Sequence, residues 1–208
     1  AYFDRTSREQ ANFDDYENTF DVDFMDRFRL ARQQISWGGG MRFTHEDNPV
    51  VVSGLTFTPQ NRTDNLLTGF LQDDIGLVEN RLTLSLGTKI IHTNFTSLQW
   101  QPSVRLLWTP TDHQTVWAAF THAVRTPSDA EENFSLAGFI GIAPGGIPFF
   151  ARFNPNHHFR PEELNGYELG YRRLLAAKFY FAIATFFNHY GDLFSEDITG
   201  APFLETNP

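Results

Sequence analysis

The sequence contains no cysteine, and this absence removes a whole group of sites from consideration. Without thiols the chain has no disulfide framework, no thiolate metal site and no cysteine nucleophile. Positive charge is also scarce, because 16 Lys and Arg stand against 25 Asp and Glu, for a net charge of −9. Nucleic-acid surfaces need clustered Lys and Arg to neutralise phosphates, so we expect no nucleic-acid partner.

Long apolar runs are missing as well. The mean hydropathy is −0.34, and no stretch reaches the roughly 20 apolar residues that a membrane-spanning helix requires. Helix signals are weak throughout. A transmembrane β-barrel remains open, because its tilted strands need only about 10 alternating residues each and its overall hydropathy stays low.

The two ends of the sequence carry no targeting signal. The opening "AYFDRTSREQ" has neither a basic segment nor an apolar core, so we expect no signal peptide. The closing "APFLETNP" is irregular and polar. We therefore expect the chain to be an internal piece of a longer protein.

What the sequence does contain is aromatic residues in a period-two pattern. Aromatics make up 15% of the chain, and Phe alone accounts for 22 residues. From residue 80, Leu82, Leu84 and Leu86 share one face of an expected strand, and polar residues occupy the other face. Similar alternation predicts eight strands, with fragments at each end: 18–30, 33–46, 64–76, from 80, from 103, from 115, from 163, and 178–190. The last of these is apolar on both faces, so its pattern does not indicate which face meets lipid.

The connections between these strands alternate strictly between short and long. Short turns are expected at 31–34, 77–80, 110–114 and 174–178, and longer connections at 45–63, 92–100 and 126–161. Outer-membrane barrels show this asymmetry, with short periplasmic turns and long extracellular loops. A β-sandwich mixes its loop lengths more freely.

Arginines within these apolar strands fit the same interpretation. Arg105 alternates with Val104 and Leu106, and a barrel wall is apolar outside and polar inside. An arginine can therefore alternate with Leu and Trp without entering lipid. We expect four cations to face the lumen: Lys89, Arg105, Arg125 and Arg172.

Several stretches, taken in order, resemble the β-barrel of TonB-dependent outer-membrane receptors. They are "YFDRTSRE", "TFDVDFMDRF", "ISWGGGMRF", "LLTGFLQDDIGLVENRLTLSLGTKI", "PSVRLLWTPTDHQTVWAAFTHAVRTPS", and "RPEELNGYELGYR" followed by "FFNHYGDLFS". The resemblance spans nearly the whole chain. It implies an all-β, antiparallel, up-and-down transmembrane barrel in the bacterial outer membrane, here a partial barrel of about 8–10 long strands.

The same resemblance implies active uptake of a scarce ligand such as a ferric siderophore. Its implied partners are outer-membrane lipid and lipopolysaccharide, an iron chelate or similar ligand, and a TonB complex reached through a plug domain. We expect residues 1–208 to be part of one barrel domain that lacks the plug and the C-terminal strands. The lumen cations would pair with the acidic face of a plug, and direct contact with the ligand is the less favoured alternative.

Two stretches are candidate ligand-binding sites in the extracellular loops. His157 and His158 could bind a metal or iron chelate, although two histidines need further ligands and a solvated loop pair is the commoner arrangement. The Gly- and Pro-punctuated loop 137–153 could receive an aromatic or anionic ligand through Phe149, Phe150 and Arg152, or could fold over the barrel mouth.

Three other functions remain as alternatives: a passive porin, a barrel enzyme and a soluble glycan-binding β-sandwich. For an enzyme, His122 with Ser128 is the pair to test. Asp73 and Asp74 have no second acid, base or nucleophile assigned beside them. We therefore expect no covalent chemistry, no catalytic residue, no cofactor and no resident metal.

Overall fold

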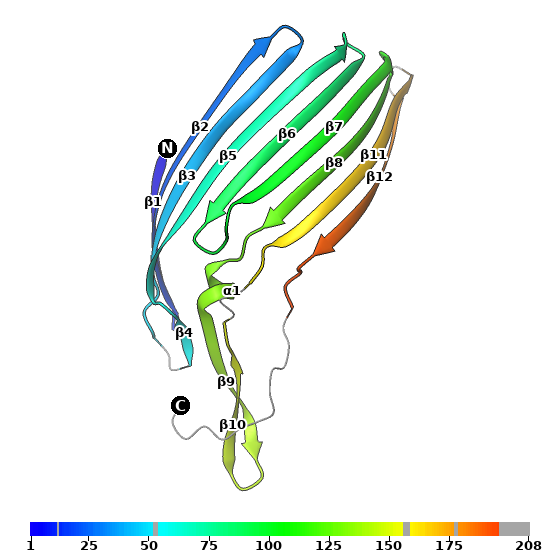
Figure 1. The fold of residues 1–208 in the computed structure, drawn as a ribbon. Helices are drawn as coiled ribbons and strands as arrows, with labels where there is room; N and C mark the ends of the chain where they lie inside the picture. Colours follow the sequence, from blue (N-terminus) through cyan, green and yellow to red (C-terminus); the bar gives the residue numbers. More distant parts are fainter. Residues whose placement is uncertain (12, 52–53, 156–158, 177–178, 196–208) are drawn as a thin grey trace.

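Nine antiparallel strands form one sheet in a computed structural model that describes residues 1–11, 13–51, 54–155, 159–176 and 179–195 (Figure 1). The order across the sheet is β1-β2-β3-β5-β6-β7-β8-β11-β12. The strands are β1 (Tyr2–Glu9), β2 (Asp14–Leu30), β3 (Gln33–Asp47), β5 (Asn61–Val78), β6 (Leu82–Thr93), β7 (Gln99–Thr111), β8 (Gln114–Arg125), β11 (Glu162–Ala176) and β12 (Phe179–Gly191). The predicted up-and-down antiparallel fold is confirmed.

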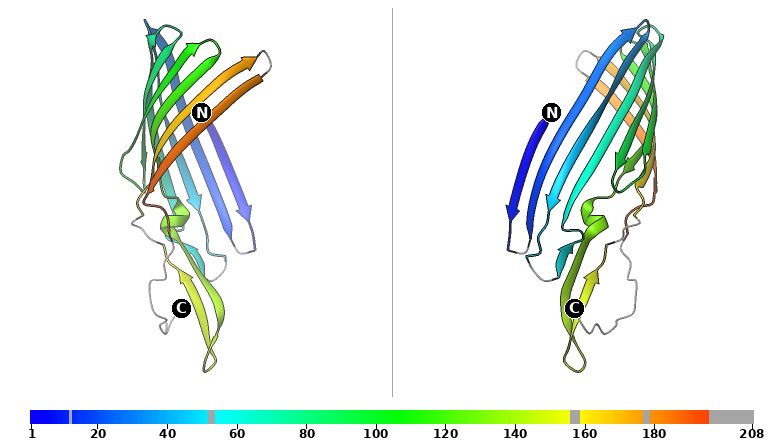
Figure 2. Two further views of the ribbon diagram at one scale, coloured as in Figure 1. Left: turned by 90° about the vertical axis from the view of Figure 1, so that its right-hand side faces the viewer. Right: turned by 60° about the vertical axis from the view of Figure 1, so that its left-hand side comes forward.

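The sheet is long and curved. Strands β2 to β12 of this sheet run from 12 to 18 residues, and even 12 residues extend about 40 Å. A tilted strand needs only about 9–11 residues to cross a membrane. Figure 2 shows the nine strands curving into an open trough, which is part of a barrel wall. In the described part of the chain, no helix is long and apolar enough to cross a membrane.

A second, three-stranded sheet projects from one end of the trough, in the order β10-β9-β4 (Figure 1). It consists of β4 (Leu55–Phe57), β9 (Phe134–Ala143) and β10 (Ile147–Phe153), and the short helix α1 (Asp129–Asn133) precedes it. The predicted long connections 45–63 and 126–161 therefore contain regular structure. The predicted long connection 92–100 is shorter in the structure, because only residues 94–98 separate β6 from β7, but it still exceeds the short turns 31–32, 79–81 and 112–113.

The strand register divides the wall into two chemically different faces. Directly opposed residues of antiparallel strands project to the same side, and Leu84 pairs with Leu106, which pairs with Ala118. Leu82, Leu84 and Leu86 share one side as predicted, and five residues of β7 and β8 share it with them: Val104, Leu106, Val116, Ala118 and Phe120. We call this side the apolar face. Thr83, Ser85, Lys89 and Arg105 project to the other side, the polar face.

The apolar face continues across the sheet and settles the orientation of β12. Through β11, Phe187 pairs with Tyr167 and Ile183 pairs with Tyr171, and both tyrosines share the side of Phe120 and Val116. On the other strands the apolar face carries Phe3, Phe20, Val22, Phe24, Trp37, Met41, Phe43, Leu67 and Leu71. The polar face carries ion pairs instead, such as Arg42 Nε with Asp21 at 2.6 Å.

This apolar face is exposed rather than packed. Among the described residues no hydrophobic side chain is buried, while Leu86 is 42% exposed and Phe187 66%. A soluble domain does not leave so large an apolar surface in water, because its stability comes from burying that surface. The soluble β-sandwich alternative is therefore wrong.

Toward both ends of the strands, the apolar face is bordered by aromatic and polar residues, as a lipid-facing band is. Trp100 and Trp108 lie on this face of β7, and the eight residue steps from one to the other span about 26 Å. Such an apolar band, flanked by aromatic girdles, is typical of outer-membrane barrels. Asp26 and Asp73 also project to this face, within six residues of the short turns, and Asp73 accepts a hydrogen bond from Gln33 Nε2 at 2.9 Å.

The wall includes three consecutive glycines, Gly38 to Gly40 on β3, at a close approach to the neighbouring strand. A Cβ on Gly38 would collide with the carbonyl oxygen of Phe24, and one on Gly40 with the carboxylate of Asp23. Both neighbours belong to β2, the adjacent strand. Residues without a side chain therefore let these two strands pair at this point of the wall.

The two faces predict opposite tolerance for a new charge on β6. Leu84→Arg in the full-length protein places a cation on the apolar face and should destabilise it by about 2–4 kcal/mol at mid-membrane. Ser85→Arg, the matched control one residue away, should assemble normally because its side chain meets the polar face. The amount of folded protein recovered from outer membranes measures the difference. Equal recovery of the two variants would contradict the assignment of faces.

Candidate ligand-binding surface

A cluster of ion pairs fixes the base of the longest connection to the wall. Arg125, the last residue of β8, donates from Nε to Glu162 Oε2 at 2.7 Å. Its two terminal nitrogens donate to the carboxylate oxygens of Glu131 in α1 at 2.8 and 3.0 Å. One guanidinium thereby joins the end of β8, helix α1 and the start of β11. Bidentate pairing of this kind fixes geometry as well as charge.

The two carboxylates have further donors. Ser128 donates from its backbone nitrogen and its hydroxyl to Glu131 at 2.8 and 3.0 Å, and the backbone nitrogen of Phe194 donates to Glu162 at 2.8 Å. The hydrogen bond from Arg125, with that from Phe194, lowers the pKa of Glu162 to about 2. The pKa of Glu131 is lowered for the same first reason, its hydrogen bond with Arg125. Both groups therefore stay charged near neutral pH.

A second cluster attaches α1 to strand β5. Arg62 donates from Nε to Asp64 at 2.7 Å and pairs through a terminal nitrogen with Asp129 at 2.5 Å. The ring of Phe95 lies 4.4 Å from the guanidinium carbon, a distance at which the ring attracts the cation. The side chain of Arg62 is only 13% exposed. Helix α1 is thus held by ion pairs at two separate points.

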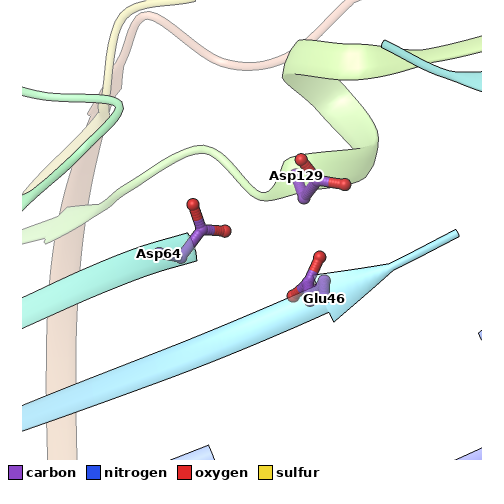
Figure 3. Close-up of side chains that lie close together, drawn as sticks. All are labelled: Glu46, Asp64 and Asp129. Carbon is purple, nitrogen blue, oxygen red and sulfur yellow. The ribbon is translucent and has the colours of Figure 1, made fainter. Parts of the chain in front are cut away.

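Glu46 brings a third carboxylate to this second cluster (Figure 3). Oxygen atoms of Glu46, Asp64 and Asp129 all lie within 4.8 Å of one another. Glu46 lies beyond the apolar band, because it stands three residues past Phe43, the last apolar side chain on the apolar face of β3. Burial raises the pKa of Glu46 to about 7, and the charges of Asp129 and Asp64 add to this rise.

Three carboxylates can supply oxygen ligands to a hard cation such as Ca²⁺. Here Arg62 already pairs with Asp64 and Asp129, so the arrangement is accounted for as an ion-pair network. Sequence reasoning missed it because its members come from β3, β5 and α1. One local signal did indicate the position of α1: Ser128 and Glu131 form the S-x-x-E capping box at the start of this helix.

The predicted binding loop 137–153 is a β-hairpin rather than an irregular loop. It turns at Gly145 and Gly146, which have φ of 95° and 80°, values that glycine adopts without steric cost. The rings of Phe139 and Phe150 lie 5.7 Å apart, edge to face. Phe149 is 41% exposed and Phe150 55%. The tip of the hairpin extends away from the wall (Figure 2).

Aromatic rings hold the hairpin's base. Phe57 of β4 lies 5.8 Å from Phe13 and 5.3 Å from Phe134, and Phe134 lies 6.1 Å from Phe153. Backbone hydrogen bonds from Ala137 to Gly54, at 2.6 Å, and from Thr58 to Asn133, at 3.0 Å, add to this attachment. The aromatic hairpin is therefore presented by a fixed platform.

The other candidate residues are distributed along the wall. Lys89, Arg105 and Arg172 lie on the polar face, and no ion pair to any of the three is found within the described ranges. Arg125 lies at the loop end, where its partners are acids of this same chain. Arg152 lies on β10 and has a partner. His157 and His158 lie outside the described residues.

Comparison with known proteins identifies this kind of wall. The family model "TonB dependent receptor-like, beta-barrel" matches residues 1–207. The chain belongs to the TonB-dependent receptor β-barrel family. Members of this family are bacterial outer-membrane proteins and are transporters rather than enzymes. A search of curated proteins finds no match.

Solved structures with the same fold include siderophore receptors. The siderophore receptor PirA from Pseudomonas aeruginosa is 16% identical with a TM-score of 0.73, over 90% of this chain and 35% of that one. PirA from Acinetobacter baumannii is 15% identical with a TM-score of 0.68, over 87% and 28%. A ferric enterobactin receptor mutant from P. aeruginosa is 18% identical, TM-score 0.68, over 85% and 27%. The chain therefore spans about a third or less of these proteins.

The two residues considered for a barrel enzyme have different hydrogen-bond partners. His122 Nδ1 lies 2.9 Å from Asn165 Oδ1 on β11, while the Ser128 hydroxyl donates to Glu131. Each side chain is thus engaged with a different partner. The expectation that the protein is not an enzyme agrees with its family.

The raised pKa of Glu46 predicts how the attachment of α1 depends on pH. Between about pH 4.5 and 7, attached α1 keeps a proton on Glu46 that the detached state has lost, so attachment weakens as pH rises through this window. Glu46→Gln should remove the dependence and strengthen attachment at neutral pH by about 1 kcal/mol after solvent screening. Hydrogen-exchange protection of residues 129–133 measures it. Asp47→Asn, one residue along β3, should leave the dependence in place; an unchanged profile in Glu46→Gln would contradict the account.

Proposed function

We propose that this chain is part of the wall and outer loop surface of a transporter that actively takes up a scarce ligand such as a ferric siderophore. The observation that carries the proposal is an aromatic hairpin fixed on a platform at the long-loop end of a TonB-dependent receptor wall. Support comes also from the siderophore receptors that share its fold. A passive porin is the alternative, and energy dependence separates the two.

The proposal includes further strands and a plug domain supplied by the parent protein. Strands β1 and β12 lie at the two ends of the sheet, and lipid does not tolerate unpaired backbone groups. In this view residues 1–208 are part of one barrel domain. The cations of the polar face, Lys89, Arg105 and Arg172, then face the lumen and pair with acidic groups of the plug. Coupling to the TonB complex runs through that plug.

The ligand surface is assigned to the hairpin. The exposed rings of Phe149 and Phe150 supply flat apolar contacts, while Arg152 on the same strand supplies a cation for an anionic chelate. Aromatic and arginine side chains carry most of the energy at many binding surfaces. His157 and His158 follow the hairpin in sequence and join this proposal as contacts of the ligand. Lipopolysaccharide and other lipid surround the wall.

Ligand binding by the hairpin is tested in the full-length receptor. Replacing Phe149 and Phe150 together with Ala should weaken binding of the transported chelate about tenfold or more. Ile142→Ala is the matched control, because Ile142 is an exposed hairpin residue without a ring. Equilibrium binding of a panel of ferric chelates to purified receptor measures the effect. Equal affinities for the two variants would remove the rings from the site.

Active uptake is tested separately in cells that express the receptor. Accumulation of the bound chelate should cease when the proton motive force is dissipated, while surface binding persists. Accumulation that continues unchanged, in proportion to external concentration, would identify a porin instead.

A further inference from the structure

Four histidines occupy equivalent positions on four strands of the wall. They are His45 on β3, His92 on β6, His122 on β8 and His189 on β12. The register places all four on the apolar face: His45 follows Phe43, His92 follows Ile90, and His122 and His189 both pair with Asn165 of β11. The sequence has seven histidines, and these four are the ones that lie on described strands.

On the apolar face, each of the four stands two residues beyond a large apolar side chain, and Val124 of β8 is the one apolar residue that follows any of them on these four strands. The preceding apolar residues on the same face are Phe43, Ile90, Phe120 and Phe187. In every case the step leads toward the long-loop end of the wall, where α1 and the hairpin lie (Figure 1). The four histidines therefore mark one border of the apolar band, and we call them the histidine belt.

The rings are accessible and partly oriented. His45, His92 and His189 are exposed and His122 is half-buried. His122 Nδ1 lies 2.9 Å from the side-chain oxygen of Asn165, which accepts, so Nδ1 carries the proton and Nε2 remains for another partner. His45 Nδ1 lies 3.0 Å from the Thr63 hydroxyl. These contacts hold the rings on the wall without occupying their second nitrogen.

The border of a lipid-facing band meets lipid headgroups, and their phosphates are the anionic groups found at that depth. Imidazole donates hydrogen bonds to phosphate oxygens and gains a positive charge between about pH 8 and 5. Cationic residues near a membrane surface attract anionic lipids. Charged neighbours on the same face are Arg5, Asp47 and Glu163. From this placement we infer that the histidine belt binds the phosphate groups of anionic lipids in the outer leaflet, more tightly as the pH falls.

The inference rests on the family membership of the wall and not on the proposed ligand uptake, so the two can fail separately. It is tested on the full-length receptor reconstituted in phosphatidylcholine bilayers. Spin-labelled phosphatidylglycerol and spin-labelled phosphatidylcholine report the relative association of anionic and zwitterionic lipid with the barrel. For the wild type, this ratio should rise about fivefold between about pH 8 and pH 5.

Two sets of substitutions separate charge from folding. Changing all four belt histidines to Gln should keep the ratio low at both pH values, and changing all four to Arg should keep it high at both. His113→Gln serves as the control, because His113 lies in the short β7–β8 turn at the opposite end of the wall. This control should behave as the wild type, and chelate uptake should be unchanged in every variant.

Three results would overturn the inference. One is a pH response that persists in the Gln variant, and another is an Arg variant whose lipid selectivity equals that of the Gln variant. The third is a wild-type response that disappears when a chelator removes divalent metal, because this would indicate a histidine metal site. A folded barrel is verified for each variant by its heat-modifiable migration in electrophoresis, so loss of folding is not mistaken for loss of binding.

Discussion

A backbone amide in hydrocarbon has no water to bind, and this constraint determines the form of the whole chain. Each long strand pairs with its neighbours through an antiparallel ladder, so the peptide groups of the wall bind one another. Once the ladder is formed, side chains must alternate between the two sides. The separation of Leu84 from Arg105 is therefore a consequence of backbone pairing combined with the sequence pattern.

The same constraint is relaxed beyond the apolar band, where water is present. There the chain uses charge rather than apolar contact: Arg62 and Arg125 attach α1 to the wall through four carboxylates. Aromatic rings then carry the hairpin on this base. The wall and the loop surface are thus built from different interactions, and a change in one should leave the other intact.

The sequence predicts the wall well because the relevant pattern is local. In β6 the alternation of Leu82, Leu84 and Leu86 with polar residues identifies both the strand and its faces. It does not predict the hairpin, because Gly138 and Gly141 interrupt the alternation on β9 and resemble loop residues. The carboxylates of Glu46, Asp64 and Asp129 were also missed. They meet only when the register of β3 with β5 and the position of α1 are known.

The central claim is that the face carrying Leu82, Leu84 and Leu86 meets lipid. Because the chain contains no cysteine, single cysteines can be introduced along residues 82–90 and spin-labelled, provided that the parent receptor is first freed of any others. The accessibility of each label to dissolved oxygen, relative to a water-soluble nickel complex, measures its contact with lipid. The account predicts a period of two, with high oxygen accessibility at the positions of Leu82, Leu84, Leu86 and Ile90. Maxima at Thr83, Ser85 and Lys89, or no periodicity at all, would contradict it.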